Sequence, residues 1–406
     1  MSVAQGTSLA IAAWAQTGLG VPRSGNGAQL LRRESGMGKL AVATYQNSEI
    51  TEHRQSTGKT HGGRSATFSL NGLLSGGSYS TLLASILRKA FTATTAFAAS
   101  TITISGTAAL YTFTASAATP TFLTLGLKAG DVVRLSAAGG TAANLAHNIL
   151  VVNVTTELVF TGVTLNDVAL TPEAITTCTV TVVGKKAIVA ATSQTSEYWT
   201  VEEWSSDISQ SSLYTDLVWG SADVSIPATG NTTVAFNAVA LDRTIAGTRV
   251  LTTPTAETTS KVTSSINGIV LVNGAAVANV TGATLKIDGA AAPIGAVLGS
   301  NVSPDIQRGI LSVSGQVTAF WENGTMSGYF DAATPIGLVL VVAVDDTNAS
   351  EFVSFSMSKV TLDSDDRDDG QKAIVRTYAF TAEINGAGGA ILANDKTILS
   401  VQDSLA

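Results

Sequence analysis

The chain has 406 residues, of which 45% are hydrophobic and only 13% are charged, and its formal net charge at pH 7 is −7. This length is enough for two or three domains with cores of their own. The acidic balance argues against a protein that reads nucleic acid, because such proteins need a basic surface. So low a charge content favours a subunit that buries much of its surface against neighbouring copies.

The sequence also limits the redox chemistry and the membrane classes. Cys178 is its single cysteine, which excludes an internal disulfide and a zinc site built on several cysteines and suits folding in a reducing cytoplasm. The longest apolar run, Ile336 to Val344, is far shorter than the ~20 residues of a membrane helix and is typical of a buried strand. The apolar stretch Leu9 to Trp14 follows no basic segment. We therefore expect neither a signal peptide nor a membrane anchor.

The elements expected in the first quarter of the chain are an arm, strands and one helix. Residues 1–36 are polar and glycine-rich and predict an N-terminal arm that becomes ordered against other subunits. Strands are predicted at Lys39–Thr44 and at Ala66–Leu70, where apolar and polar residues alternate. The glycine-rich segment between them, Ser56–Gly63, is interpreted as a long loop. Apolar residues at helical spacing over Tyr79–Ala90 predict an amphipathic helix that faces the core.

Residues 96–193 are interpreted as an inserted accessory domain. They contain five short strand signals: Thr101–Ile104, Asp131–Leu135, Ile149–Val154, Val159–Leu165 and Cys178–Val183. This number of strands over this length predicts a small SH3-like or OB-like barrel. Lys128–Arg134 reads as a turn that feeds one of the strands. Farther along, the threonine-rich segment 246–263 is predicted to be a linker.

A segment near the start of the chain recurs near its end. Residues 63–76 align without gaps on residues 315–328, with glycine, phenylalanine, Asn-Gly and Ser-Gly residues at one offset. Two shorter matches follow: Glu197–Val201 with Glu351–Phe355, and Ala235–Ala238 with Ala379–Ala382. Gly328–Pro335 is expected to hold a shorter version of the first helix. Repeated segments predict two copies of one β module.

The predicted fold is therefore mainly β (α+β), with two tandem β-barrel or sandwich modules, each with a flanking helix, and an inserted small β-barrel. The predicted boundaries are an N-terminal arm at 1–36, a first module at 37–95 and 194–245, the inserted barrel at 96–193, a linker at 246–263 and a second module at 264–406.

Two motifs resemble chemical sites but lack required residues. Gly58-Lys59-Thr60 matches the end of a phosphate-binding loop, but His53 stands where the loop needs glycine, and a strand is expected to follow instead of a helix. Asp363–Gly370 resembles a calcium loop, but Arg367 and Arg376 would fall at ligand positions. We interpret it as a solvated hairpin tip, and opportunistic cation binding by the Asp363–Asp369 loop stays open.

The remaining polar candidates do not form a catalytic group either. His53 and His61 have no Glu or Cys at ligand spacing and are interpreted as exposed loop histidines. The adjacent Glu202 and Glu203 would point to opposite faces of a strand, which makes a poor acid/base pair. The pair Arg32-Arg33 is too small for a nucleic-acid patch. We predict no catalytic, cofactor-binding or metal-binding residue, no cofactor, and a chain that is not an enzyme.

Segments spread over the chain outside the insertion resemble the tail tube protein (major tail protein) of long, non-contractile-tailed bacteriophages of the siphovirus type. The segments are Thr17–Pro22 with Leu31-Arg32, Asn47–Ile50 with Arg54-Gln55 and Gly62-Gly63, Phe68–Leu70 with Tyr79–Leu83, Lys359–Asp363, Asp369-Gly370 and Ala379–Ala382. Their order carries the resemblance. The dense Asp cluster in the closing hairpin departs from the family pattern.

The resemblance implies a virion structural protein of the tail tube that is assembled in the host cytoplasm. Six modules would form a ring with a continuous inner barrel, and rings would stack into a hollow tube. With two modules per chain, three chains would complete a ring of pseudo-sixfold symmetry. The partners would be other copies, the tape-measure protein and the tail terminator. Genomic DNA would pass through the lumen on ejection without sequence-specific binding, and the inserted barrel would lie outside.

Two other classes of protein are weighed against this interpretation. A secreted or surface β-repeat adhesin, or a capsid decoration protein, would share the threonine-, alanine- and glycine-rich β repeats, but would not form hollow tubes of fixed diameter. A carbohydrate-active enzyme would need two placed carboxylates beside tryptophans such as Trp199, Trp204 and Trp219. The sequence shows no such pair, and Trp199 and Trp204 are expected to fill a strand core.

Overall fold

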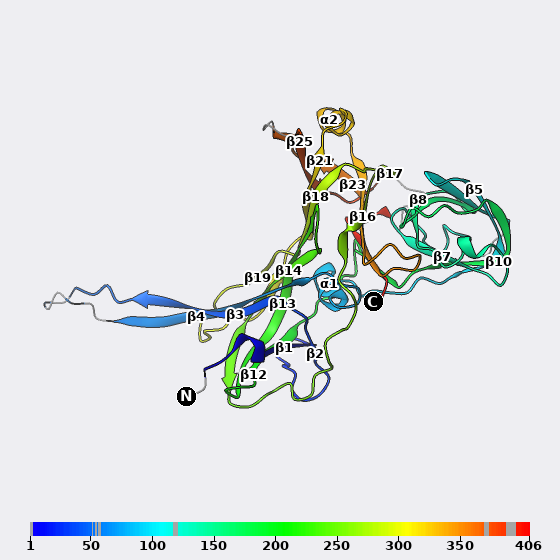
Figure 1. Ribbon diagram of the computed structural model, residues 1–406. Coiled ribbons are helices and arrows are strands. Elements are labelled where there is room, and N and C mark those ends of the chain that lie inside the picture. Colours follow the sequence, from blue (N-terminus) through cyan, green and yellow to red (C-terminus); the bar gives the residue numbers. More distant parts are fainter. Residues whose placement is uncertain are drawn as a thin grey trace.

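The structure is a computed structural model that describes residues 3–50, 52, 55, 58–116, 121–368, 373–386 and 395–406. As predicted, the chain is mainly β, and the described residues contain two α-helices, α1 (Ser80–Leu87) and α2 (Thr325–Asp331). Figure 1 shows a central sheeted body from which a long hairpin projects on one side and a closed barrel on the other.

The strands of the body form two sets. The first strand set comprises β1 (Leu9–Ala15), β2 (Gln29–Leu30), β3 (Ser35–Gln46), β4 (Lys59–Leu73), β12 (Trp199–Ser205), β13 (Gln210–Pro227), β14 (Thr233–Ala240) and β15 (Asp242–Ala246). The second strand set comprises β16 (Ser264–Val272), β17 (Ala275–Ala276), β18 (Val280–Asp288), β21 (Ser312–Phe320), β22 (Ile336–Ala343), β23 (Phe352–Leu362), β24 (Asp366–Asp368), β25 (Val375–Ala382) and β26 (Ser400–Asp403). The short strands β19 (Ala291–Pro293) and β20 (Ile306–Arg308) pair within the loop between β18 and β21.

The same antiparallel pairings occur in both strand sets. The first strand set contains β1–β2, β1–β12, β3–β4, β4–β14, β12–β13, β13–β14 and β13–β15. The second contains β16–β17, β16–β22, β18–β21, β21–β25, β22–β23, β23–β25 and β23–β26 in the corresponding order along the chain. The repeated segments 63–76 and 315–328 overlap β4 and β21, which hold the same place in the two strand sets. Their residue-by-residue alignment is wrong, because Leu70 pairs with Phe236 and Gly315 with the matching Phe380, and because Phe68 is buried whereas Phe320 is 46% exposed.

One of the shorter sequence matches is displaced by one strand. Glu197–Val201 overlaps β12, which pairs with β1, whereas Glu351–Phe355 overlaps β23. The strand that holds the place of β12 is β22, because β22 pairs with β16 as β12 pairs with β1. The match failed because an acidic residue followed by aromatic and β-branched residues is common at strand starts and does not fix strand order.

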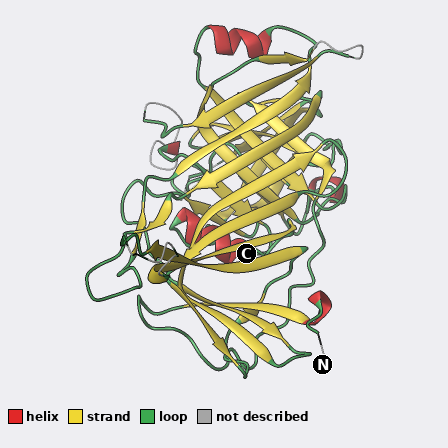
Figure 2. Cartoon of the chain, turned by 90° about the vertical axis from the view of Figure 1, so that its left-hand side faces the viewer, coloured by secondary structure: helices red, strands yellow, loops and turns green. Residues whose placement is uncertain are grey.

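A single row of hydrogen-bonded strands joins the two strand sets. Its order is β3–β4–β14–β13–β18–β21–β25–β23, and Figure 2 shows its strands running diagonally across the broad face of the body. The strand β13 pairs with different strands along its length. Its first part pairs with β12 and β15, and its last part pairs with β14 and β18. The β13–β18 pairing, from Ser221↔Asp288 to Pro227↔Gly282, connects the strand sets.

The helix α1 covers the apolar face of the sheet in the first strand set. The predicted stripe is buried, including Leu82, Leu83, Ile86 and Leu87, so the core-facing helix is confirmed. It is shorter than predicted because Arg88 adopts a left-handed conformation (φ 54°), and its N–H caps the carbonyls of the last turn. In the second strand set, α2 begins before the predicted Gly328–Pro335, and none of its residues is buried.

Two expectations for the start of the chain were wrong. The arm predicted at 1–36 contains β1, which the chain's own β12 orders, and Ile11 is buried there. The segment interpreted as a loop is part of β4 from Lys59 onward, paired as far as Gln46↔Lys59. Backbone pairing does not require alternating apolar side chains, so a polar hairpin that projects into solvent leaves little strand signal.

The predicted small barrel is present as six strands in the closed order β10–β5–β6–β9–β8–β7. The strands are β5 (Phe97–Thr107), β6 (Leu110–Ala115), β7 (Val132–Ser136), β8 (Ile149–Thr156), β9 (Val159–Thr164) and β10 (Glu173–Val182), so all five predicted strands appear and β6 was missed. Stacked aromatic rings, among them Phe113 and Phe160 at 4.6 Å, fill its core. The next strand, β11 (Lys185–Ile188), leaves the barrel and pairs with β26.

Candidate assembly surface and barrel joint

The long strand row has one apolar face and one polar face. In β14, Val234 and Phe236 are buried while Asn237 points to the opposite side. Residues that are paired across antiparallel strands have side chains on the same face of the sheet. The residues paired with Asn237, and those paired in turn across the next strands of the row, therefore form a second face, which carries small polar side chains. They include Ser69, Ser221, Ser225, Thr284, Ser314, Gln316, Thr318, Thr377 and Thr381. The side chains of this polar face are mostly hydroxyls and amides.

Several charges on the polar face lie close to charges of opposite sign. Asp223 is paired across the strand joint with Lys286, whose ammonium lies 3.5 Å from the Asp288 carboxylate. Burial raises the pKa of Asp223, while Lys286 acts in the other direction. Lys359 and Glu383 form a second pair at 2.6 Å. Such a surface offers a polyanion no unbalanced block of positive charge.

Residues 195–382, which run from β12 to β25, match the family model described as phage tail tube protein. This match supports a phage tail tube protein, as the resemblance had implied. A search of curated proteins found no match. The match supports a structural protein of the tail tube, and that family implies a place in the virion.

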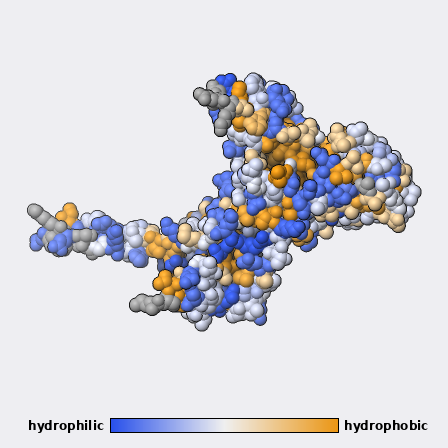
Figure 3. Space-filling view, in the orientation of Figure 1, coloured by the Kyte–Doolittle hydropathy of each residue, from blue (hydrophilic) through white to orange (hydrophobic). Residues whose placement is uncertain are grey.

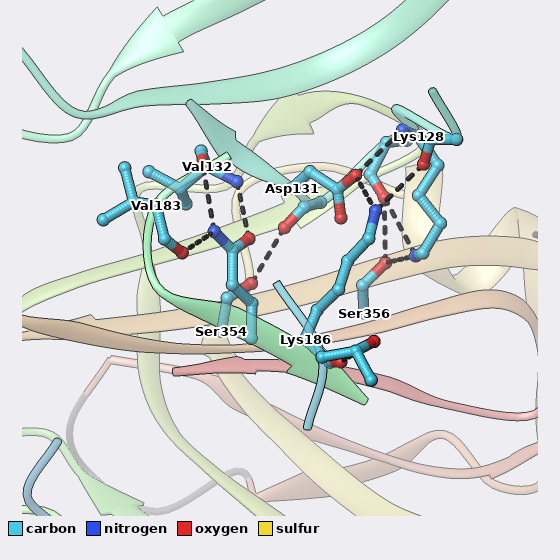
Figure 4. A network of polar contacts seen from close by, with 12 residues as sticks. Lys128, Asp131, Val132, Val183, Lys186, Ser354 and Ser356 are labelled. Carbon is cyan, nitrogen blue, oxygen red and sulfur yellow. Dashed lines mark hydrogen bonds and ion pairs between the residues drawn. The ribbon is translucent and has the colours of Figure 1, made fainter. Parts of the chain in front are cut away.

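The chain holds its barrel against β22, β23 and β26 through a buried polar network (Figure 4). The Lys186 ammonium donates to the Asp131 carboxylate at 2.7 Å and to the Gly126 carbonyl at 2.9 Å. The backbone N–H of Lys128 donates to the same carboxylate at 3.0 Å. The Lys128 ammonium donates to the Ser356 hydroxyl at 3.2 Å. The network thus pairs the buried Lys186 with the Asp131 carboxylate, while the buried Lys128 ammonium is stabilised by both Asp131 and Asp395.

Gln402 on β26 extends the network as a clamp between barrel and body. Its amide nitrogen donates to the carbonyls of Val132 and Val183, at 2.9 and 2.8 Å, and its amide oxygen accepts from the Val132 N–H at 2.7 Å. The Ser354 hydroxyl donates to the Gly130 carbonyl at 3.0 Å. Because every one of these bonds crosses from the body to the barrel side, they fix the barrel's orientation.

Gly130 is required for this close approach. Its φ is +87°, and a Cβ there would lie 2.4 Å from the Ser356 hydroxyl oxygen. A larger residue would therefore be strained in its backbone and would push the barrel away from β23. The predicted turn at Lys128–Arg134 is thus the contact point of the barrel, but its role as a contact has no signature in the sequence.

Lys128→Met is expected to raise the free energy of unfolding by about 1–2 kcal/mol at neutral pH, because methionine fills the site without a buried charge. Burial lowers the pKa of Lys128, although Asp131 opposes this effect. In the wild type, stability should rise as the pH climbs from this lowered pKa toward the ordinary value of 10.5, since only the unfolded chain then keeps the proton. The gain from the substitution should therefore shrink with rising pH. Thermal unfolding at several pH values tests this, and a loss of stability at neutral pH would contradict it.

The sequence motifs that lack required residues form no chemical site in the described part of the chain. Lys59 and Thr60 lie at the start of β4, so no phosphate loop precedes a helix there, and His61 is exposed on this strand instead of in a loop. His53 lies outside the described residues. Arg32 donates to the Ser260 carbonyl at 2.6 Å, and Arg33 donates to the Leu9 carbonyl, so both arginines bind the chain's own backbone.

The two adjacent glutamates of β12 serve different sides of the strand, as predicted. Glu202 is fully buried and accepts from the N–H groups of Val250 and Leu251 at 2.7 and 2.8 Å. Glu203 accepts from the Gly38 N–H at 2.8 Å, and burial raises its pKa. The Glu202 carboxylate thus binds the backbone of the segment after β15, and the Glu203 carboxylate binds the backbone of β3.

The Asp cluster at the end of β23 makes contacts within its own hairpin. Asp365 forms an ion pair with Arg376, whose guanidinium lies 4.7 Å above the ring of Trp321. Asp363 accepts from the Thr381 hydroxyl at 2.7 Å. Asp369 and Gly370 lie outside the described residues. Among the described residues, no group of three or more His, Cys, Asp or Glu side chains could hold a metal ion, and no helix among them has the length and apolar character to cross a membrane.

Proposed function

We propose that the chain self-assembles into rings that stack into the hollow tail tube of a siphovirus-type phage, through which the genome is ejected. The family match over residues 195–382 carries this proposal. The chain would contribute two tandem modules, so three chains would form a ring of pseudo-sixfold symmetry. The two matching strand sets and the continuous strand row that joins them support this count. The SH3-like or OB-like character of the barrel and the domain boundaries stay predictions.

The polar face of the strand row would line the lumen. Its small hydroxyl and amide side chains, with charges close to opposite charges, would let DNA pass without binding, because tight binding to DNA needs several unbalanced cations that displace counterions. The barrel is attached behind the row in the view of Figure 2, so it would lie on the outer surface of the tube. The interactions with the tape-measure protein and the tail terminator, and assembly in the host cytoplasm, belong to this proposal.

Negative-stain electron microscopy of the purified chain tests the proposal. We expect hollow rings or tubes of one diameter, with mass measurement giving three chains per ring. A deletion of the barrel strands is unsuited as a control because β11 and Gln402 tie the barrel to the body. Isolated particles at high concentration would contradict the tube and favour an adhesin or a decoration protein. Rings of six chains would contradict the count of two modules per chain and would leave the tube itself supported.

A further inference from the structure

We propose that His147 is an acid-sensitive switch in the attachment of the barrel to the loop between β22 and β23. This attachment stays closed while the imidazole is neutral, and it opens locally when the imidazole takes up a proton. The attachment lies on the barrel side of the body, away from the projecting hairpin (Figures 1 and 3), and is separate from the buried network around Lys186 and Gln402. The switch would act in the single chain, so it does not depend on the proposed function.

The first part of the attachment is Asn148, just before β8. It binds residues 344–351, which join β22 to β23. The backbone N–H of Asn148 donates to the Asn348 carbonyl at 2.8 Å, and its side-chain nitrogen donates to the Ser350 carbonyl at 2.7 Å. Its side-chain oxygen accepts from Arg134 on β7 at 2.7 Å. Asn148 is 1% exposed, so water does not compete for these bonds.

Two further side chains of the barrel bind the same loop of the body. The Arg134 guanidinium donates to the Ala349 carbonyl at 3.1 Å. The Asn166 side chain, just after β9, donates to the Asp346 carbonyl at 3.1 Å and to the Asn348 side-chain oxygen at 2.9 Å. We call the bonds that Arg134, Asn148 and Asn166 make to the body the loop contact. Because they are all polar, the loop contact depends on the polar groups buried beside it.

His147 is buried beside the loop contact without a good partner for its ring. It directly precedes Asn148, its side chain lies next to that of Asn166, and it is 1% exposed. Within the described part of the chain, neither ring nitrogen has a hydrogen bond of good geometry. The Asn166 nitrogen already binds the body, which leaves its oxygen as an acceptor for the ring. A protonated imidazole has two N–H donors and a charge, and burying these without partners is strongly unfavourable.

No charged side chain among the described residues compensates for this burial. Burial lowers the pKa of His147, and a neighbouring amide alone acts in the other direction. Glu173 instead accepts from the Thr141 hydroxyl at 3.0 Å, and Asp345 accepts from the Thr347 hydroxyl at 2.6 Å. The charged side chains on the elements that meet here are Arg134 on β7, Glu173 on β10, Asp167 after β9, Lys261 before β16, and Asp345, Asp346 and Glu351 between β22 and β23.

Acid should therefore favour an open loop contact. In the closed form the pKa of His147 lies below its ordinary value of 6.5, and in an opened, hydrated form it returns toward that value. Above this ordinary value both forms carry a neutral ring, so the contact keeps its full stability. Below it, the open form takes up the proton first, and opening should increase about tenfold per pH unit. The increase levels off once the pH has fallen below the lowered pKa of the closed form.

Hydrogen exchange of the full chain, measured by mass spectrometry from about pH 7.5 to about pH 5, tests the switch. Rates are corrected for the intrinsic effect of pH. The peptides to follow carry the N–H of Asn148 and that of Leu165, which donates to the Asn148 carbonyl at 3.0 Å. Their protection should fall about tenfold per pH unit below the ordinary pKa. Protection of the Val132 N–H, which Gln402 binds, should stay constant.

His147→Phe is the matched variant, because it keeps an aromatic ring in the buried site and cannot be protonated. Protection of Asn148 in this variant should not depend on pH over the same range. His61→Gln, at an exposed histidine of β4, should leave the pH dependence of the wild type unchanged. Equal pH dependence in the wild type and in His147→Phe would overturn the switch and assign the opening to carboxylates. A wild type without pH dependence would also overturn it.

A second measurement covers the case in which His147→Phe does not fold. The chain has three histidines, so a variant with His53→Gln and His61→Gln keeps His147 as its single imidazole. Titration of this imidazole by nuclear magnetic resonance should give a midpoint below the ordinary value of 6.5. A midpoint at or above this value would show that the ring is not held neutral by burial and would overturn the switch.

Discussion

Asp131→Asn is expected to lower the free energy of unfolding by about 3–5 kcal/mol, because it leaves the buried Lys186 ammonium without its carboxylate. The Asp131 and Lys186 side chains are 2% and 6% exposed, so water cannot replace the lost charge. The substitution conserves the shape of the side chain, which isolates the effect of charge from that of packing. Urea or thermal unfolding of the purified chain measures it.

The matched control for Asp131→Asn removes both charges of the pair. In Asp131→Leu combined with Lys186→Met, no buried charge of the ion pair is left alone, and exchange of a buried pair for apolar residues is often neutral or stabilising. We expect the double variant to be more stable than Asp131→Asn. If the single substitution cost less than about 1 kcal/mol, the ion pair would not hold the barrel to the body.

Phe236→Ala is also expected to lower the free energy of unfolding by about 3–5 kcal/mol, because it opens a cavity in the core of the first strand set. Phe236 is fully buried, and its ring centroid lies 5.4 Å from that of Tyr79 on the α1 side and 6.1 Å from that of Trp219. Chemical denaturation gives the change in unfolding free energy. The variant should also assemble less, since the strand row needs this core behind it.

Asn237→Ala is the control for Phe236→Ala, because the two residues are neighbours on β14 that face opposite sides. A substitution on an exposed face is expected to change stability by no more than about 0.5 kcal/mol. Equal losses for both variants would show that the polar face is covered in the single chain. Such a result would remove the surface that we assign to the lumen.

Part of the fold could be predicted because its signals are local. The alternation over Ala66–Leu70 marks a strand with one apolar face, and the stripe within Tyr79–Ala90 marks a helix with one buried side. Both signals arise from side chains of one element that share a face. The same local alternation is visible in β6, where Tyr111 and Phe113 are buried, and could have been used to predict the missed strand.

The candidate site could not be predicted in this way, because its members are distant in sequence. Lys128 meets Ser356, and Gln402 meets Val132, across more than two hundred residues. In the sequence, Lys128–Arg134 looks like any polar turn. The sequence does not distinguish a buried lysine from an exposed one. Only the packing of the barrel against β23 and β26 buries Lys128.

By itself, the sequence determined a β-rich chain with a repeated segment, one amphipathic helix and a small inserted barrel, since each depends on the order and period of neighbouring residues. The tertiary structure alone decided which strands pair, that the polar hairpin of β3 and β4 projects from the body, and where the open edges lie. The physical reason is that backbone hydrogen bonds between strands are nearly independent of side-chain identity, so pairing partners are selected by the packing of the whole chain.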